Sequence, residues 1–382
     1  MSDKTKKKKN VKFLDRFSAK SKHTALRMLV SILIGLALAI VLIFIASDRP
    51  LTSIQYLFTA PLTSWPYFSM WMQNTLPLIF TGVAVCIMFS ANQFNLGLEG
   101  SFLFGGFVGG ALANIYLFKG TPVLGIIGGC IIGGIVGAII TLIPAILEKL
   151  VGASIMVTSL MMNYICLWVS QWLLFSYFKD PKTSAGSYYW TDGRNPIFVS
   201  TFGKGNSKLT VYWAFLLAIL VVFVCWVLLF RTKLGFRIRM VGHNKDFAKY
   251  IGVSVPFIAI ISQVIGGFIG GVGGAAEVLS IFTSYSWQDL TGFGWDGVTM
   301  AIFAGNNPKN VPIAALFIGY LRTGAYIMSL KTGVQNDLTS VVEGVIILFL
   351  LAERFLQGTY RKMIIKEAER ERDALLLEKE GE

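Results

Sequence analysis

The sequence predicts an all-α fold, a polytopic transmembrane helix bundle of about ten helices with some broken or re-entrant helices. Three observations support this prediction. Of the 382 residues, 54% are hydrophobic and only 14% are charged, whereas soluble domains carry about 25% charged residues. The chain has 39 glycines, a residue more frequent in membrane helices than in soluble ones. Apolar segments of spanning length, or close to it, follow one another along the chain.

Together these segments make up a predicted transmembrane domain, residues 29–353. Two of them are glycine-rich or short, so we expect these two to be the broken or re-entrant helices, buried in protein. They are 98–118 and 293–306. The full set of predicted segments is 29–47, 69–89, 98–118, 122–147, 152–178, 210–230, 254–275, 293–306, 311–329 and 338–353.

The distribution of basic residues sets the predicted orientation. Residues 1–28 form a basic tail with ten Lys or Arg, whereas the loop after the first predicted helix carries only Arg49. The positive-inside rule therefore places the N-terminus in the cytoplasm, and ten crossings place the C-terminus there too. The loop 231–253 then lies inside and the long loop 179–209 outside. The charged segment 354–382 is expected to be a cytoplasmic tail.

The sequence shows no catalytic or metal centre. All four cysteines lie inside apolar runs and are expected to be small buried hydrophobic residues. His23 and His243 have no companion at metal-ligand spacing. Gly292, Gly294 and Gly297 form a G-x-G-x-x-G pattern, but no strand precedes it, so it does not indicate a dinucleotide site. We therefore predict a non-catalytic chain that binds no cofactor or metal itself.

Polar residues within apolar segments each need a physical reason, because they are costly at membrane depth. Asn95 and Glu99 flank a predicted helix start, where capping and pairing with the helix dipole explain them. Asn163 lies mid-helix and suits hydrogen bonding between helices. The alternative for all three is that they line a solute pathway. Arg322 and Glu343 lie in the last two predicted helices and are expected to form a buried ion pair.

Glycines recur at four-residue spacing in three predicted helices. Small residues on one face allow two helices to approach closely in lipid. This spacing predicts close packing inside one chain, with a dimer face as the alternative. The glycines are Gly105 and Gly109; Gly129, Gly133 and Gly137; and Gly266, Gly270 and Gly274.

A short internal echo links two parts of the chain. Gly82-Val83 begins a run that ends in a polar turn at Asn92–Asn95. Gly297-Val298 begins another run that ends in Gly305-Asn306-Asn307-Pro308. Paired halves with interrupted helices near the transport path are common in transporters.

The loop 231–253 predicts a short polar helix between two spanning helices. Asn244 is a candidate N-cap, Asp246 suits the first turn and Gly252 suits the end of the helix. The loop has two interpretations. It is either a solvated connector that obeys the positive-inside rule, or a lever held by a cytoplasmic partner.

Three motifs, in this order, resemble a known family. They are Phe94-Asn95-Leu96-Gly97-Leu98-Glu99-Gly100, the loop from Gly235 to Val253, and Gly305-Asn306-Asn307-Pro308. The chain resembles the membrane permeases of bacterial ABC importers for simple sugars and nucleosides, a family that also includes branched-chain amino acid permeases. The similarity extends over residues 70–352, and the chain looks most like the larger nucleoside permease.

The resemblance implies a permease subunit in the bacterial cytoplasmic membrane, surrounded by lipid, with no nucleic acid partner. A cytoplasmic ABC ATPase would bind ATP and Mg. A second, related permease would complete a heterodimer, and an extracytoplasmic binding protein or lipoprotein would deliver the solute. The implied function is nucleoside import. The alternatives are import of ribose or another simple sugar by the same mechanism, and an ion-coupled secondary transporter.

The resemblance also assigns expected roles to two groups of residues. Residues of the short polar helix and its approach would form the coupling helix that docks on the ATPase. They are Gly242, Asn244, Lys245, Asp246, Ala248, Lys249 and Tyr250. Residues able to stack on or hydrogen-bond a solute are candidates for the pathway. They are Asn95, Glu99, Asn163, Trp287, Asn306 and Asn307.

Overall fold

The computed structural model describes residues 37–38, 40–41, 43–45, 49–112, 122–178, 188–189, 199–202, 209–282, 284–285, 287–333, 341 and 344. The chain divides into two compact units. One is Gln55–Met328, and the other combines Met1–Ile54 with Ser329–Glu382. The predicted tails 1–28 and 354–382 and Glu343 lie outside the described residues, as do most of the helices predicted at 29–47 and 338–353.

Most described residues lie in helices. The helices are α2 (Pro50–Thr63), α3 (Trp65–Ser90), α4 (Leu98–Gly105), the π-helix η1 (Gly106–Leu112), α6 (Pro122–Val151), α7 (Ile155–Leu173), the π-helix η2 (Leu174–Phe178), α8 (Ala214–Arg231), α9 (Lys233–His243), α10 (Lys245–Tyr250), α11 (Val255–Ile281), α12 (Phe293–Phe303), the 3₁₀ helix η4 (Pro308–Asn310) and α13 (Val311–Thr332). The strands are β1 (Tyr188–Tyr189), β2 (Val199–Phe202), β3 (Leu209–Tyr212) and β4 (Ser284–Tyr285).

Among the described residues, six helices are long and apolar enough to cross a membrane. They are α3, α6, α7 with η2, α8, α11, and η4 with α13. Each corresponds to one predicted segment, so the prediction of a mostly helical fold with several spans is confirmed. The side of the membrane on which the termini lie stays a prediction.

The two segments expected to be interrupted contain short helices. α4 has 8 residues and continues into the 7-residue η1, while residues 113–118 lie outside the described part. α12 has only 11 residues. At 1.5 Å per residue, a helix of that length extends about 16 Å, roughly half the hydrocarbon thickness of a bilayer. α12 alone is therefore too short to cross.

Within the described residues, four short strands add to the predicted all-α fold. β2 pairs antiparallel with β3, and β1 pairs antiparallel with β4. The sixth helix was expected from residue 210, but Leu209–Tyr212 forms β3 and helix α8 begins at Ala214. The β-branched Thr210 and Val211 favour an extended chain. The Thr210 amide also donates to Ser69 Oγ at 2.9 Å, which holds β3 against α3.

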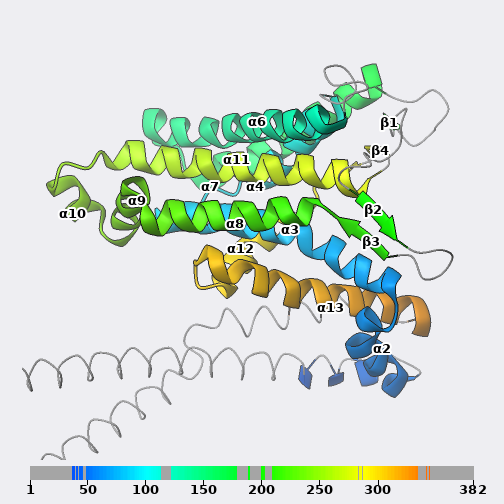
Figure 1. Ribbon diagram of the computed structural model, residues 1–382. Helices are drawn as coiled ribbons and strands as arrows, with labels where there is room; N and C mark the ends of the chain where they lie inside the picture. The colour runs from blue at the N-terminus through cyan, green and yellow to red at the C-terminus, as the bar shows by residue number, and fades with distance from the viewer. Residues whose placement is uncertain are drawn as a thin grey trace, which may run out of the picture. The chain divides into compact units, whose positions relative to one another are not determined.

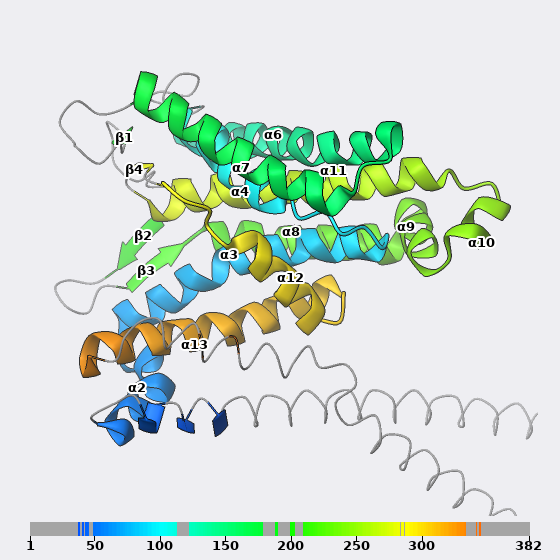
Figure 2. The same ribbon diagram turned by 180° about the vertical axis from the view of Figure 1, so that it is seen from behind.

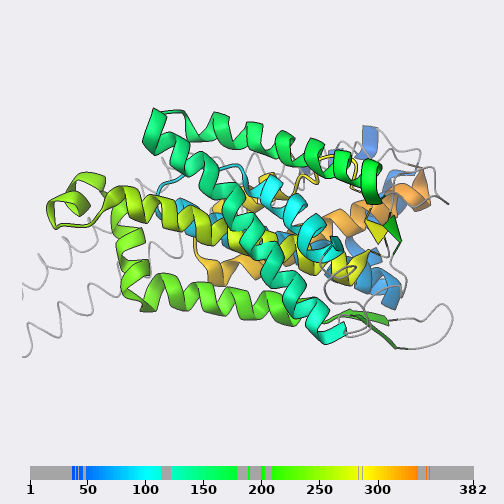
Figure 3. The same cartoon turned by 90° about the horizontal axis from the view of Figure 1, so that it is seen from above.

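Helix α11 lies among α6, α3 and α4 (Figures 1 and 3). Its glycines bring helix backbones into contact. A Cβ added at Gly105 would lie 2.6 Å from the Gly271 Cα. A Cβ added at Gly133 would lie 2.8 Å from the Gly271 carbonyl oxygen and 2.9 Å from that of Gly105. No side chain fits at these crossings, so the prediction of close packing within one chain is confirmed.

The internal echo corresponds to helices α3 and α12, which cross each other. A Cβ at Gly297 would lie 2.8 Å from the backbone of Thr81, and a Cβ at Gly82 would lie 2.8 Å from Met300 Cβ. Each helix also ends near an asparagine with positive φ, Asn92 at 54° and Asn306 at 55°. Two segments far apart in sequence thus share a glycine crossing and a similar end.

Within the unit Gln55–Met328, helices α9 and α10 lie at one end of the long helices and the strands lie at the other (Figures 1 and 2). The ends of α3 and α9 meet where Gly242 contacts the backbone of Ser90. The end of α8 meets the turn between α12 and α13, because the Lys309 ammonium lies 3.8 Å from the centre of the Trp226 ring. The loop 231–253 therefore contacts the end of α3, and helix α8, which leads into the loop, contacts η4.

Candidate functional site

The turn between α3 and α4 is fixed by Asn95, which is buried. Its Nδ2 donates to Gln263 Oε1 at 2.6 Å and to the Thr141 carbonyl at 3.2 Å, and its Oδ1 accepts from the Gly97 amide at 2.8 Å. Thr141 Oγ1 in turn donates to the Gln263 carbonyl at 3.0 Å. This turn is thereby joined to both α6 and α11, through partners that the sequence did not indicate.

Asn163 on α7 holds the same turn from another side. Its Nδ2 donates to the Leu96 carbonyl at 2.9 Å, and its Oδ1 accepts from the Gly100 amide at 2.9 Å. Ser159, one helical turn away, accepts from the Leu96 amide at 3.0 Å. The predicted hydrogen bond between segments is confirmed, and these contacts satisfy both polar atoms of the Asn163 side chain. A role for it in a solute pathway stays a prediction.

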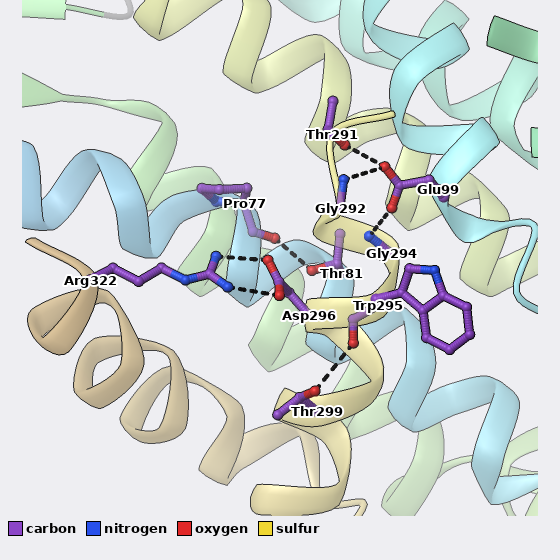
Figure 4. Close-up of polar contacts among 10 residues, drawn as sticks. All are labelled: Pro77, Thr81, Glu99, Thr291, Gly292, Gly294, Trp295, Asp296, Thr299 and Arg322. Atoms are coloured by element: carbon purple, nitrogen blue, oxygen red, sulfur yellow. Dashed lines mark hydrogen bonds and ion pairs between the residues drawn. The ribbon is translucent and has the colours of Figure 1, made fainter. Parts of the chain in front are cut away.

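Glu99 links the start of α4 to the start of α12 (Figure 4). Its Oε1 accepts from Thr291 Oγ1 at 2.7 Å and from the Gly292 amide at 2.6 Å, and its Oε2 accepts from the Gly294 amide at 2.5 Å. Only 1% of Glu99 is exposed. Glu99 lies in the first turn of α4, where the sequence predicts pairing with the helix dipole, and its hydrogen bonds also reach the N-terminus of α12. Free amides at a helix N-terminus favour a carboxylate.

Glycine at 292 permits this arrangement. Its φ is +79°, a left-handed conformation that residues with a Cβ rarely adopt. The chain turns at Gly292 so that its own amide and that of Gly294 both point at the Glu99 carboxylate (Figure 4). The G-x-G of this segment therefore serves a protein carboxylate, consistent with rejecting a dinucleotide site.

Asp296 and Arg322 form a bidentate ion pair between α12 and α13 (Figure 4). The Asp296 oxygens lie 2.7 Å and 2.8 Å from the two terminal guanidinium nitrogens of Arg322. The side chains are 18% and 25% exposed. The sequence predicts a pair between Arg322 and Glu343, which lies outside the described residues, and gives no indication of Asp296. No periodic signal connects Asp296 with Arg322, because they lie on different helices.

Trp287 lies in a cluster of aromatic side chains beside α4. Its ring stacks on Phe102 with centroids 5.8 Å apart and meets Tyr285 edge-on at 5.5 Å.

Glu277 on α11 is 4% exposed, and its Oε2 has no hydrogen-bond partner among the described residues. Glu277 is not among the site residues predicted from the sequence. A buried carboxylate oxygen without a donor is unusual enough to need an explanation.

Asn306 and Asn307 lie at the opposite end of α12 from Gly292. The Asn306 amide donates to the Ala301 carbonyl at 2.8 Å, which closes the end of α12. Asn307 Oδ1 accepts from the Lys309 amide at 3.2 Å and caps η4. These two residues shape a turn. Of the six pathway candidates, the structure therefore gathers Asn95, Glu99 and Asn163 around one turn, with Trp287 beside α4, and places Asn306 and Asn307 apart.

The loop 231–253 forms two helices, each with a side-chain cap. Thr232 Oγ1 accepts from the Gly235 amide at 3.1 Å and begins α9. Asn244 Oδ1 accepts from the Phe247 amide at 3.0 Å and begins α10, which confirms the predicted N-cap. Gly252, with φ of +81°, follows the end of α10.

The two faces of this loop differ. Ala248 is 0% exposed and Gly242 contacts the backbone of Ser90, so both face the bundle. By contrast Tyr250 is 95% exposed and Phe247 is 56% exposed. The outward-facing surface of α10 therefore consists of two aromatic rings and exposed charged side chains. Phe247 was absent from the predicted coupling residues, because the sequence alone did not show which side of so short a helix faces outward. The charged side chains are those of Lys245, Asp246 and Lys249.

Comparison with known families decides the class of protein. Residues 67–351 match the family described as "Branched-chain amino acid transport system / permease component". The chain belongs to this family. It is a multi-pass membrane permease of the ABC transporter class, a non-catalytic subunit that works with a separate ATPase and a solute-binding protein. The predicted family membership and non-enzymatic role are confirmed.

Relatives of known name cover most of the chain. A guanosine ABC transporter permease protein of Bacillus subtilis is 28% identical over 87% of this chain and 96% of its own length. A nucleoside ABC transporter permease protein of Lactococcus lactis is 28% identical over 86% of this chain and 90% of its own. A glucose ABC transporter permease protein of Haloferax volcanii is 24% identical over 86% of this chain and 87% of its own.

Proposed function

We propose that this permease moves nucleosides into the cell, driven by an ABC ATPase that holds helix α10. The observation that carries the proposal is the outward pair Phe247 and Tyr250 on a helix whose Ala248 is anchored inward. Exposed aromatic rings are the usual anchors of a protein interface. Two relatives with nucleoside or guanosine in their names support the choice of solute.

The contacts of the loop suggest how force would reach the bundle. Gly242 contacts Ser90 at the end of α3, and Gly252 leads within three residues into α11. α3 and α11 pack against each other through glycines, so a push on α10 would move them as a block. Rigid-body rocking of packed helices is a common way to alternate access in transporters. In this mechanism the ATPase contacts the exposed residues of α10 and its N-cap. They are Asn244, Lys245, Asp246, Lys249 and Tyr250.

We further propose that the solute passes beside the interrupted helices α4 and α12. Trp287 and its aromatic neighbours would stack on a nucleobase. Asn95, Glu99 and Asn163 would act mainly by holding α4 and α12 in place, since their side chains already bond within the protein. Asn306 and Asn307 would shape the turn nearest the coupling loop.

The proposed assembly has further parts, and the proposed orientation sets the side of the membrane on which each of them lies. A second, related permease would complete a heterodimer, and a binding protein or lipoprotein would dock on the face that carries loop 179–209. The segments 1–28 and 354–382 would be cytoplasmic tails. A pull-down of the tagged chain from membranes tests these partners. Recovery of two copies of this chain and no related permease would contradict the heterodimer.

Solute choice is tested by uptake into cells with and without this chain. We expect deletion to abolish uptake of radiolabelled guanosine and leave ribose uptake unchanged. Loss of ribose or glucose uptake with unchanged guanosine uptake would favour the sugar alternative. Transport by the purified chain alone under an ion gradient would favour a secondary transporter instead.

A further inference from the structure

A cavity of about 500 Å³ lies where α8 ends and α9 begins. Four of its lining residues are basic, Arg231, Lys233, Arg237 and Arg239, and none of the ten lining residues is acidic. The remaining lining includes Phe230, Phe236, Met240 and Ile251. The cavity therefore combines concentrated positive charge with an apolar wall.

The charge of this cavity is not neutralised within the described part of the chain. None of its four basic side chains lies within 4.0 Å of a carboxylate there. Arg239 is the most informative of them. Its guanidinium lies over the Phe230 ring at 4.9 Å, and its buried Nε has no hydrogen-bond partner among the described residues. A buried donor without an acceptor is costly, so an acceptor from outside the chain is expected there.

The position of the cavity indicates the depth at which this acceptor lies. Arg231 is the last residue of the spanning helix α8, and Val253 lies two residues before the spanning helix α11. The cavity therefore opens where two spans end. Trp226 nearby is covered by two cations, Arg231 at 5.7 Å and Lys309 at 3.8 Å from its ring centre. Tryptophan and basic residues together are typical of the headgroup region.

We propose that this cavity binds the headgroup of an anionic phospholipid, with the phosphate accepting hydrogen bonds from Arg239 and its basic neighbours. A phosphate oxygen is a strong acceptor for arginine. The exposed rings of Phe230 and Phe236 distinguish a lipid from free phosphate, because they provide an apolar surface for acyl chains. Basic pockets between helices at the cytoplasmic side are known to bind anionic headgroups. The site stands independently of the transported solute.

Binding is measured by native mass spectrometry of the full chain purified in an uncharged detergent. The probe is dioctanoyl-phosphatidylglycerol, with dioctanoyl-phosphatidylcholine and inorganic phosphate as comparison ligands. We expect saturable binding of the phosphatidylglycerol and weaker binding of the phosphatidylcholine. Equimolar inorganic phosphate should not displace the phosphatidylglycerol. Arg239→Gln should weaken binding of the phosphatidylglycerol about tenfold, since a hydrogen bond between charged groups is lost.

Lys149→Gln is the matched control, because it removes one charge from an exposed residue at the end of α6, outside the cavity. Its affinity should equal that of the unaltered chain. Equal affinities for Arg239→Gln and Lys149→Gln would overturn the proposal. Displacement by equimolar phosphate would also overturn it, in favour of a free-anion site. If Arg239→Gln aggregates, Lys233→Gln, an exposed member of the cavity, should show the same direction of change, and no change there would overturn the proposal.

Discussion

The glycine-lined core around α11 and the α9–α10 loop are built on opposite principles. At the core, Gly105, Gly133 and Gly271 bring three helix backbones so close that no Cβ fits between them. In the loop, Tyr250 is 95% exposed and the basic residues carry no described ion pair. In the mechanism proposed above, the tightly packed bundle moves as a block, whereas the exposed face of the loop is held by the ATPase.

This contrast predicts different consequences of mutation. Changes in the core should lower the stability of the protein and reduce transport only through that loss. Changes on the outer face of the loop should leave stability intact and reduce transport directly.

Removal of one partner of the Asp296–Arg322 pair should destabilise the bundle most. Arg322→Met leaves the Asp296 carboxylate without its bidentate partner. We expect a loss of about 3 kcal/mol, the low end for a buried pair because both side chains are partly exposed. Thermal unfolding in detergent measures it. The double variant Asp296→Asn/Arg322→Met should recover much of the loss, and a double variant as unstable as the single one would contradict the ion pair.

The carboxylate that caps α12 should come next. In Glu99→Gln one acceptor oxygen is replaced by an NH₂ group, which leaves an amide of Gly292 or Gly294 unsatisfied. We expect a loss of about 2 kcal/mol from one buried donor. Glu148→Gln, an exposed glutamate on α6, is the control. Equal melting temperatures for the two variants would show that the cap at Gly292 contributes nothing.

Two adjacent glycines on α6 sharpen the comparison further. Gly133 faces the backbones of Gly105 and Gly271, whereas the atoms nearest to a Cβ at Gly134 belong to the ring of Phe268, which is 38% exposed. Gly133→Ala should cost about 1 kcal/mol net, since overpacking outweighs the gain in helix propensity. Gly134→Ala should be neutral, because the Phe268 ring can move away. The same unfolding measurement applies, and equal losses would mean that the backbone crossing is not tight.

The smallest effect on stability is expected on the outer face of α10. Tyr250→Ala removes a ring that is 95% exposed, so the free energy of unfolding should change by less than about 0.5 kcal/mol. Ala248→Arg is the contrast, because Ala248 is fully buried and an arginine there would separate α10 from the bundle. If both variants unfolded alike, the division between inner and outer faces would be wrong.

Several features were predictable from the sequence because they depend on local composition. Apolar length located the six spanning helices, and residue type located Asn244 as the cap of α10. Four-residue glycine spacing predicted the tight crossings at Gly105 and Gly133. In each case neighbours in sequence carry the signal, so the tertiary fold was not needed to find it.

Other features depend on partners that are distant in sequence. Glu99 bonds to residues more than 190 positions away, and Asp296 pairs with Arg322 on another helix. Nothing in the local pattern of either carboxylate names its partner. Residues 210–212 of strand β3 fall in the helix predicted at 210–230, because they continue the apolar run of α8. The sequence also does not predict which face of α10 is buried, because six residues are too few to show a helical period.

The proposed mechanism requires an ATPase to move this permease by holding the outer face of α10. Its most direct test is transport in proteoliposomes that contain the complete assembly, with the double variant Phe247→Ala/Tyr250→Ala beside the unaltered chain. Tyr164→Ala, which removes an exposed ring from spanning helix α7, is the matched control. We predict that the double variant reaches the membrane at normal levels, loses ATP-driven guanosine uptake and fails to retain the ATPase, while the control transports normally. Normal ATP-driven uptake by the double variant would contradict the claim.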